Sequence, residues 1–540
     1  MPLRTCVSPE GTFKVGIHNP GFEVENLRQN TQKDVLGRLF DDSPVENQIN
    51  FPSSTVSADK TDRIYEIANA FPFRGTTFIN SAWADRKAAK PDAIALPPSP
   101  DCSLTKNLVK WQNKETKEAS SLPPVLDLLP RPLLLALAQA STDPDELATL
   151  AAKACDLLFD NGKDMPPTGV AFKEIKPGRP VPVIHDHDLY DILGNNPCLP
   201  DAYKEVMVLR PGIQGNSEII GEAIEDTHVF EYLRRNSYIP WGHFASNMAN
   251  DEIRYNVKDL TLSDISGIRH LYYQRIYVRL AQELGLKLPA TQRPFTPREL
   301  EALRLSVAKA VESEKTDALF FNSSLWGWNY GFGFAQSGDR LHASHQMIHQ
   351  QNAMVPEKIS DDQGNPYHCF SCGDLVTDFI QDYKATYDQE FFPAYIRAIQ
   401  SNQRTDMNDQ GPDSLIVWED EQVMLFVPKA QVSEWELQLM TKTVCPHILA
   451  ADTPTRHSLD RAMLIALQTL DTLGAKMVTS IEFSGRFNRP DNGQHIMYSF
   501  IPRLPYAPGT FSEAQLRWIS GCFPEDFALA CRRAAKKISL

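Results

Sequence analysis

The sequence predicts an α+β protein in which antiparallel β-sheets are flanked by helices. Short segments rich in apolar and aromatic residues alternate with helical patterns between residues 195 and 540. Two of these segments, 415–418 and 423–427, flank a four-residue polar turn, as expected for a hairpin. The order strands, helix, strands also occurs twice, and each half has a histidine near the end of a strand. A parallel, doubly wound sheet would not produce this pattern.

The composition indicates a soluble globular protein of two or three domains. The chain has 540 residues, of which 42% are hydrophobic and 23% charged, and this length exceeds what one core usually holds. No apolar run reaches the roughly 18–20 residues that cross a bilayer, and the N-terminal residues lack an apolar signal core. We therefore expect a cytoplasmic protein without a membrane partner.

The net charge of -14 argues against a nucleic-acid partner, because such proteins usually carry a basic face. A small anionic ligand, held by a few local cations and backbone N–H groups, remains compatible with this charge. Nine cysteines are scattered along the chain, and only Cys369 and Cys372 are close-spaced. This usage is typical of a reduced compartment with one metal-binding knuckle rather than of a disulfide scaffold.

Three regions are expected along the chain. Residues 1–190 are rich in proline and form an irregular, partly helical N-terminal extension, in which Ser141-Thr-Asp-Pro opens a helix over 143–159. Residues 195–360 and 366–540 form two further units. The first is expected to contain a strand at 205–210, helices at 261–284 and 296–314, and strands at 318–321 and 326–335. The second adds to the hairpin a strand at 435–440, a helix at 458–473 ended by Gly474, and strands at 477–483 and 495–501.

The run around His349 is the main candidate for chemistry. It reads Asn329-Tyr-Gly331, followed by Ala343-Ser344-His345-Gln346-Met347-Ile348-His349-Gln350-Gln351. A neutral imidazole can attack a phosphoryl group near pH 7 without first losing a proton. A histidine in a loop after a strand is the plain alternative.

This run resembles the signature of the galactose-1-phosphate uridylyltransferase and dinucleoside-polyphosphate phosphorylase branch of the histidine-triad superfamily. That signature reads Asn-x-Gly, a spacer, then Ala-Ser-x-x-His-x-His-x-Gln. The resemblance implies that His349 is the nucleophile and that Gln351 and Ser344 donate hydrogen bonds to phosphoryl oxygens. It also implies that Asn329 and Gly331 line the nucleotide pocket. The first histidine of the signature is replaced by Met347. Independently of the signature, Arg340 could contact a phosphate.

Later segments extend the resemblance to residues 200–540. They include Cys369-Phe-Ser-Cys372-Gly-Asp, Leu425-Phe-Val-Pro, His495-Ile-Met497 and Ile501-Pro-Arg-Leu. The resemblance implies two fused histidine-triad-like units with antiparallel sheets, the first at 195–360 with the catalytic motif and the second at 366–540. The N-terminal extension lies outside it.

Cys369 and Cys372 are the best candidates for a structural zinc site, which needs four Cys or His ligands in a tetrahedron. The resemblance suggests His447 and His495 as the other two ligands. The alternative is a pair of free, buried cysteines.

The expected function is nucleotidyl transfer through a covalent histidine intermediate. A nucleoside monophosphate would move from a nucleotide sugar or dinucleoside polyphosphate to a phosphate or sugar-phosphate acceptor. Two alternatives remain open: a non-catalytic nucleotide-binding or scaffold protein derived from such an enzyme, and a histidine-triad hydrolase that passes the nucleotidyl group to water. The expected partners are these small molecules, and a homodimer is one option for the assembly.

Overall fold

The structure is a computed structural model that describes most of the chain. The described residues are 3–25, 33–47, 55–98, 100–116, 125–160, 162, 165–177, 179–194, 196, 198–208, 257–289, 295–312, 319–331, 348–361, 363–489, 493–504, 512 and 514–538.

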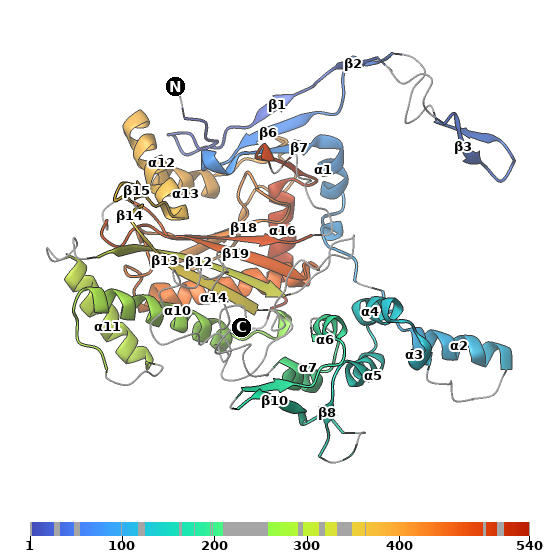
Figure 1. The fold of residues 1–540 in the computed structure, drawn as a ribbon. Coiled ribbons are helices and arrows are strands. Elements are labelled where there is room, and N and C mark those ends of the chain that lie inside the picture. The colour runs from blue at the N-terminus through green and yellow to red at the C-terminus, as the bar shows by residue number, and fades with distance from the viewer. Residues whose placement is uncertain are drawn as a thin grey trace.

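One antiparallel sheet of seven described strands is the centre of the molecule (Figure 1). Its spatial order is β13-β12-β19-β20-β18-β17-β16, and every neighbouring pair is antiparallel. The strands are β12 (Phe321–Gly331), β13 (Ile348–Pro356), β16 (Ile416–Glu419), β17 (Val423–Phe426), β18 (Leu437–Thr441), β19 (Met477–Phe483) and β20 (Met497–Pro502). The prediction of an α+β protein with antiparallel strands is confirmed. The strands of the two predicted units share this one sheet.

Helices cover one face of the sheet along its whole width. They are α10 (Leu262–Glu283), α11 (Pro297–Glu312), α14 (Thr453–Thr472) and α16 (Pro524–Ala535). Their apolar residues share a core with alternate residues of the strands, including Trp326, Trp328 and Tyr498. We call this the helix-covered face. In Figure 1, α10 and α14 lie below the sheet.

Local signals fix the ends of these helices. Thr261 caps α10, because its hydroxyl accepts the N–H of Asp264 at 3.2 Å and the Asp264 carboxylate accepts the N–H of Thr261 at 2.7 Å. In α14 the Asp452 side chain accepts the N–H of Thr455 at 2.9 Å. Gly474 follows α14 with a φ of +101°, a conformation that glycine adopts without the strain of a Cβ.

A buried cluster joins the first helix of this layer to the last two strands that the chain adds to the seven-stranded sheet. The Arg269 guanidinium of α10 is fully buried and donates to the hydroxyls of Tyr273 at 2.8 Å and Tyr498 at 2.5 Å. Its Nη1 lies 3.4 Å from the Glu482 carboxylate of β19. A buried charge needs such partners, because an unpaired one would be very costly. The cluster therefore fixes α10 against β19 and β20.

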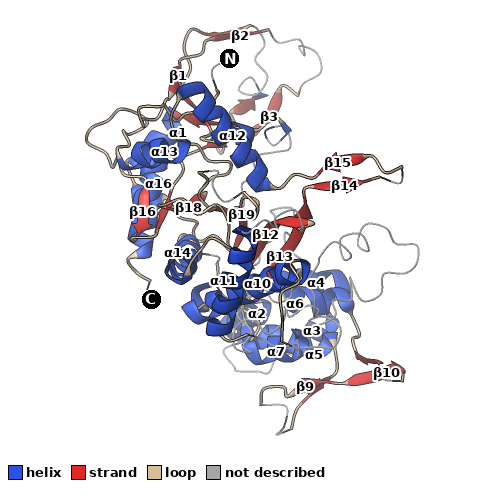
Figure 2. Cartoon of the chain, turned by 90° about the vertical axis from the view of Figure 1, so that its left-hand side faces the viewer, coloured by secondary structure: helices blue, strands red, loops and turns tan. Residues whose placement is uncertain are grey.

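Part of the opposite face is covered by α12 (Cys372–Tyr387) and α13 (Phe391–Gln400), which lie above the sheet in Figure 1 and again in the side view of Figure 2. They share a second core with residues of β17, β18, β19 and β20, including Phe426, Phe483 and Met497. A four-stranded sheet, in the order β1-β6-β7-β21, contributes to the same core. Its strands are β1 (Gly16–His18), β6 (Ile64–Ala68), β7 (Thr76–Asn80) and β21 (Arg517–Ser520).

Part of the segment 3–98 packs against the body of the molecule. Strand β7 pairs in parallel with β21, far along the chain, and helix α1 (Ser81–Ala88) follows β7. Arg74 forms a buried ion pair with Glu436 at 2.8 Å. The hairpins β2–β5 (Phe22–Val24, Val56–Ala58) and β3–β4 (Val35–Arg38, Pro44–Glu46) project away from the body in Figure 1.

A separate helical core follows. It contains α2 (Leu104–Thr116), α3 (Val125–Leu128), α4 (Arg131–Ala140), α5 (Pro144–Ala154), α6 (His187–Gly194) and α7 (Asp201–Val208), with the short pairs β8–β9 (Leu157–Leu158, Gly169–Val170) and β10–β11 (Phe172–Lys176, Arg179–Pro182). The helix predicted from Asp143 is α5, which Asp143 caps. Among the described helices, none combines the length and hydrophobicity that crossing a bilayer requires.

The predicted strand at 205–210 is wrong, because residues 201–208 form helix α7. A short apolar run has no periodicity that separates a buried strand from a buried helix. Met207 packs in the helical core, and Asp201 in the first turn favours the helix. The strands predicted at 318–321 and 326–335 are, over the described residues, one strand, β12.

Candidate functional site

The two faces of β12 are buried to different extents. Trp326, Trp328 and Tyr330 point to the helix-covered face and are 3%, 1% and 0% exposed. The alternating residues Gly327 and Asn329 point to the opposite face and are half-buried. The face that α12 and α13 cover farther along the sheet is therefore more open at β12. We call this part the open face.

The strand register brings four residues into one row across the open face. His349 of β13 is the partner of Asn329 on β12, and Asn329 is also the partner of Thr479 on β19. Thr479 in turn pairs with Ile501 of β20. Directly opposed residues of antiparallel strands project to the same side of a sheet. The row His349–Asn329–Thr479–Ile501 therefore joins the predicted nucleophile to strands from both halves of the chain.

A second row runs parallel to the first. Gln351 pairs with Gly327, Gly327 pairs with Ile481, and Ile481 pairs with Ser499. Gln351 and His349 are two residues apart on β13, so they occupy alternate positions of the strand. Gly327 carries no side chain between Gln351 and Ile481, so the backbone of β12 is accessible from this side.

A side-chain hydrogen bond joins two residues of the first row. The Thr479 hydroxyl donates to Oδ1 of Asn329 at 2.8 Å, and both side chains are half-buried. This contact links the predicted pocket residue Asn329 to a residue 150 positions away. The sequence analysis missed Thr479. In the sequence, the only indication that Thr479 belongs to the site was its polar side chain within the strand predicted at 477–483.

The other predicted substrate contacts are less fully described. Gly331 is the last residue of β12, two residues from Asn329 and thus on the same face of the strand. Arg340 and Ser344 lie outside the described residues, as does Met347. Of the predicted site, the described backbone therefore brings together His349, Gln351, Asn329 and Gly331 at one end of the open face.

Cys369 and Cys372 lie where the chain enters α12. Cys372 is the first residue of the helix, and the preceding Ser371 donates its N–H to the Asp374 carboxylate at 2.7 Å. Arg486 donates to that carboxylate at 2.7 and 2.8 Å and to the carbonyl oxygen of Cys369 at 2.6 Å. The sequence around the Cys pair therefore also encodes a helix N-terminus of the capping-box type. Burial raises the pKa of the Cys372 thiol.

The two histidines predicted to complete a zinc site are buried. Nδ1 of His447 accepts the N–H of Ala450 at 3.2 Å, and burial lowers the pKa of His447 to about 4. A neutral imidazole that accepts at Nδ1 carries its proton on Nε2, which leaves no free lone pair for a metal. His495 instead donates from Nδ1 to the carbonyl oxygen of Thr441 at 2.7 Å, and its ring stacks on Phe392.

The described residues contain no group of three or more His, Cys, Asp or Glu side chains placed to hold a metal ion. Cys369, Cys372, His447 and His495 therefore do not fit a four-ligand site in this arrangement. Zinc stays a prediction for elemental analysis, and no step below depends on it.

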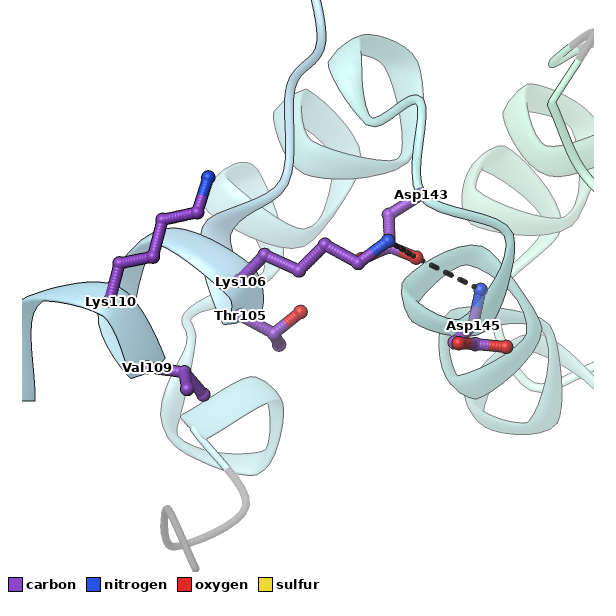
Figure 3. Close-up of a pocket in the computed structure, with 6 residues that line it drawn as sticks. All are labelled: Thr105, Lys106, Val109, Lys110, Asp143 and Asp145. Carbon is purple, nitrogen blue, oxygen red and sulfur yellow. Dashed lines mark hydrogen bonds and ion pairs between the residues drawn. The ribbon is translucent and has the colours of Figure 1, made fainter. Parts of the chain in front are cut away.

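A pocket is also present in the helical core (Figure 3). Its charged residues have structural contacts: Lys106 lies 3.0 Å from the Asp143 carboxylate, and the same carboxylate accepts the N–H of Asp145 at the start of α5. The pKa of Asp143 is lowered, because hydrogen bonds from Ser103 and Lys106 outweigh its burial. The pocket is thus separate from the open face and contains none of the predicted site residues.

Comparison with known proteins gave similar structures but no similar sequence. No family model matches the chain, and no curated protein matches it. A galactose-1-phosphate-uridylyltransferase-like (GalT-like) protein from Arabidopsis thaliana is 14% identical, covering 54% of this chain and 74% of that one with a TM-score of 0.34. An ADP-glucose phosphorylase from the same plant, with bound ADP-glucose, is 14% identical, covering 52% and 69% with a TM-score of 0.34. A uridylyltransferase is 13% identical, covering 54% and 74% with a TM-score of 0.35.

These structures come from the group that the sequence resembles. TM-scores of this size carry no functional inference, so the proposal below is based on the residues and strand register of this chain.

Proposed function

We propose that the protein is a nucleotidyltransferase that forms a covalent intermediate on His349. The observation that carries the proposal is the first row of the open face, in which His349 is the cross-strand partner of Asn329. These are two of the residues that the signature marks as nucleophile and pocket. They are 20 residues apart in sequence, so their direct pairing is a property of the fold and not of the signature alone.

We further propose that the sheet is built from two histidine-triad-like units. Strands β12 and β13 follow helix α11, and strands β19 and β20 follow helix α14. The inner strands of the two pairs, β12 and β19, are antiparallel neighbours. In the order β13-β12-β19-β20, the inner strands of the two pairs are neighbours and the outer strands lie on either side of them. This order supports a duplication in which the two units share one continuous sheet.

The reaction has two displacements at one phosphorus atom. In the first, an imidazole nitrogen of His349 forms a bond to the α-phosphorus of the donor, and the bond from that phosphorus to the bridging oxygen breaks. The leaving group, a sugar phosphate or a nucleotide, departs with the electron pair. In the second, an oxygen of the acceptor phosphate attacks the same phosphorus, the P–N bond breaks and the neutral imidazole is restored.

The remaining residues have to position the reactants and offset negative charge on the non-bridging oxygens. The amide groups of Asn329 and Gln351, which flank His349 by register, are suited to donate to these oxygens because an uncharged donor keeps its protons at any pH near neutrality. The missing side chain of Gly327 leaves space between the second-row residues for a planar base or a ribose. Ser344 and Arg340 are proposed as further phosphate contacts.

Trapping the intermediate tests the proposal. The protein is incubated with α-³²P-labelled nucleotide sugars, including ADP-glucose, and with labelled dinucleoside polyphosphates, then denatured in base. A phosphoramidate is stable in base and labile in acid, so the expected result is a base-stable, acid-labile label on the wild type and none on His349→Ala. A label that persists on His349→Ala, or a wild type that is not labelled by any donor, would contradict the proposal.

Product analysis separates the transferase from a hydrolase. The reaction is run with and without phosphate or a sugar phosphate as acceptor. A transferase yields the nucleotidylated acceptor and turns over only when the acceptor is present, whereas a hydrolase yields the free nucleoside monophosphate in both cases. A protein that binds nucleotide but gives neither product would be the non-catalytic relative.

A further inference from the structure

Thr479 lies at the boundary between the two halves of the sheet and contacts the site from the second half. Its strand, β19, is the neighbour of β12 on the side away from His349. The Thr479 hydroxyl donates to Oδ1 of Asn329 at 2.8 Å. Among the described residues, Nδ2 of Asn329 has no hydrogen-bond partner. One branch of the carboxamide is therefore bound to Thr479, and no described residue occupies the other.

The orientation of a carboxamide decides whether it donates or accepts. The oxygen only accepts, while the nitrogen offers two N–H donors. Non-bridging phosphoryl oxygens are acceptors, so only the nitrogen can stabilise their charge. In the first row, Thr479 is the partner on one side of Asn329 and His349 is the partner on the other side. Because the oxygen of the Asn329 carboxamide is bound to Thr479, the nitrogen is on the branch that remains for the side of His349.

We propose that Thr479 is a positioning residue that holds the Asn329 carboxamide with its nitrogen toward the reacting phosphoryl group. This inference rests on the proposed function, because it concerns the same site. Thr479 contacts no reacting atom itself; it acts through Asn329. The site is then composite, since β13 supplies the nucleophile, β12 the donor, and β19 the residue that orients the donor.

The test uses matched variants of the full chain. Thr479→Val removes the hydroxyl and keeps the side-chain shape, while Thr479→Ser keeps the hydroxyl. Ser480→Ala is the control: it removes a hydroxyl from the adjacent position of β19, which faces the helix-covered side and has no hydrogen-bond partner among the described residues. Asn329→Asp keeps an acceptor for Thr479 but has no N–H to donate when ionised.

Kinetics give the first readout. We expect Thr479→Val to lower kcat about tenfold with KM changed less than twofold, as for the loss of one neutral hydrogen bond. Thr479→Ser and Ser480→Ala should stay within about twofold of the wild type, because each keeps the positioning hydroxyl. Asn329→Asp should lose on the order of 10²-fold in kcat, the usual size for one transition-state donor.

A double-mutant cycle separates positioning from a general structural effect. If Thr479 acts through Asn329, then Thr479→Val has no further effect on kcat when Asn329 is already alanine. A purely structural role would lower kcat by the same factor in both backgrounds, and that result would overturn the proposal.

The last readout does not depend on activity. In protein labelled with ¹⁵N-asparagine, Asn329→Ala identifies the side-chain NH₂ resonances of Asn329 by removing them. Thr479→Val should shift this pair, and Ser480→Ala should not. An unshifted pair means that the hydrogen bond is absent and overturns the proposal whatever the kinetics show. A wild type that transfers no nucleotide overturns both proposals, whereas unchanged kinetics in Thr479→Val overturn only this one.

Discussion

The strand pairs β12–β13 and β19–β20 lie side by side in the sheet but differ in what covers them. At one end of the second pair, α12 and α13 cover the face: Met497 is 1% exposed and packs with Phe483 in their core. His495, just before β20, is 3% exposed and stacks on Phe392. Gly327 and Asn329 of the first pair are only half-buried on the same face, as are Thr479 and Ile501, which the second pair contributes to the first row.

Under the proposed function, the first pair supplies the nucleophile, while the covered end of the second pair is part of the core. His495 is buried and its Nδ1 donates to the carbonyl oxygen of Thr441, so we assign it a structural role. His349 is the residue that we propose as the nucleophile. A pair of antiparallel strands can thus form part of a binding site or part of a core, depending on whether a helix packs on its face. This comparison predicts that substitutions of the proposed site residues, Thr479 of β19 included, change turnover, while those at the covered end of the second pair change the free energy of unfolding.

The largest effect is expected for His349→Ala in the first pair. It removes the atom that bonds to phosphorus, so nucleotidyl transfer should fall at least about 10³-fold. Nucleotide binding and the melting temperature should change little. His349→Gly with added imidazole should recover part of the rate. Steady-state kinetics and thermal unfolding of the same preparations test this, and full activity of His349→Ala against a verified substrate would end the assignment.

Met497→Ala is the corresponding change in the second pair. The side chain is buried in the core beneath α12 and α13, so truncation should cost about 3 kcal/mol of the free energy of unfolding through lost burial and the cavity that remains. The specific activity of the folded protein should not change. Urea unfolding followed by circular dichroism gives the first quantity. Equal stability with reduced turnover would reverse the roles that we assign to the two pairs.

Gln351→Ala tests the second row of the open face. Loss of one donor to the developing phosphoryl charge should slow transfer by on the order of 10²-fold, with KM nearly constant. Gln350→Ala is a matched control, because the Gln350 side chain faces the other way and its Oε1 accepts the indole N–H of Trp326 at 3.1 Å. A larger loss of kcat in Gln350→Ala than in Gln351→Ala would show that the register or the assignment is incorrect.

The smallest effect is a pH dependence that comes from the second half. Burial lowers the pKa of His447 to about 4, against about 6.5 in an unfolded chain. Between these values the unfolded state binds more protons, so stability falls as the pH falls. The contribution of His447 is fully present above pH 6.5 and should decrease by about 2 kcal/mol between pH 7 and pH 5. Unfolding curves of the wild type and His447→Phe test this, and an equal pH slope in both would contradict it.

Local patterns predicted much of the second half. The strand 477–483 matches β19 residue for residue, and the helix before it ends at Gly474 as expected. The hairpin is β16–β17, because turn chemistry and short alternating strands are encoded within a few residues. Backbone register then brought His349 and Asn329 together, an outcome that their signature alone did not specify.

Long-range contacts could not be predicted. The hydrogen bond between Thr479 and Asn329 joins residues 150 positions apart, and the pairing of β7 with β21 spans nearly the whole chain. No local periodicity encodes such contacts. The Cys369-x-x-Cys372 spacing illustrates a different problem: the same six residues also contain Ser371 and Asp374, which form a helix start. One stretch of sequence can match two motifs, and the spacing of the two cysteines alone does not distinguish between them.

The parallel pairing of β7 with β21 has a consequence for how the protein is made. Trp518 donates its indole N–H to the carbonyl oxygen of Arg74, 444 residues earlier. On a ribosome that adds about 5–20 residues per second, β6 and β7 would leave the exit tunnel on the order of tens of seconds before β21 is synthesised. During that interval the edge of β7 has no partner strand. An unpaired strand edge is a template for pairing with other chains, so slowing translation between the two strands should increase aggregation.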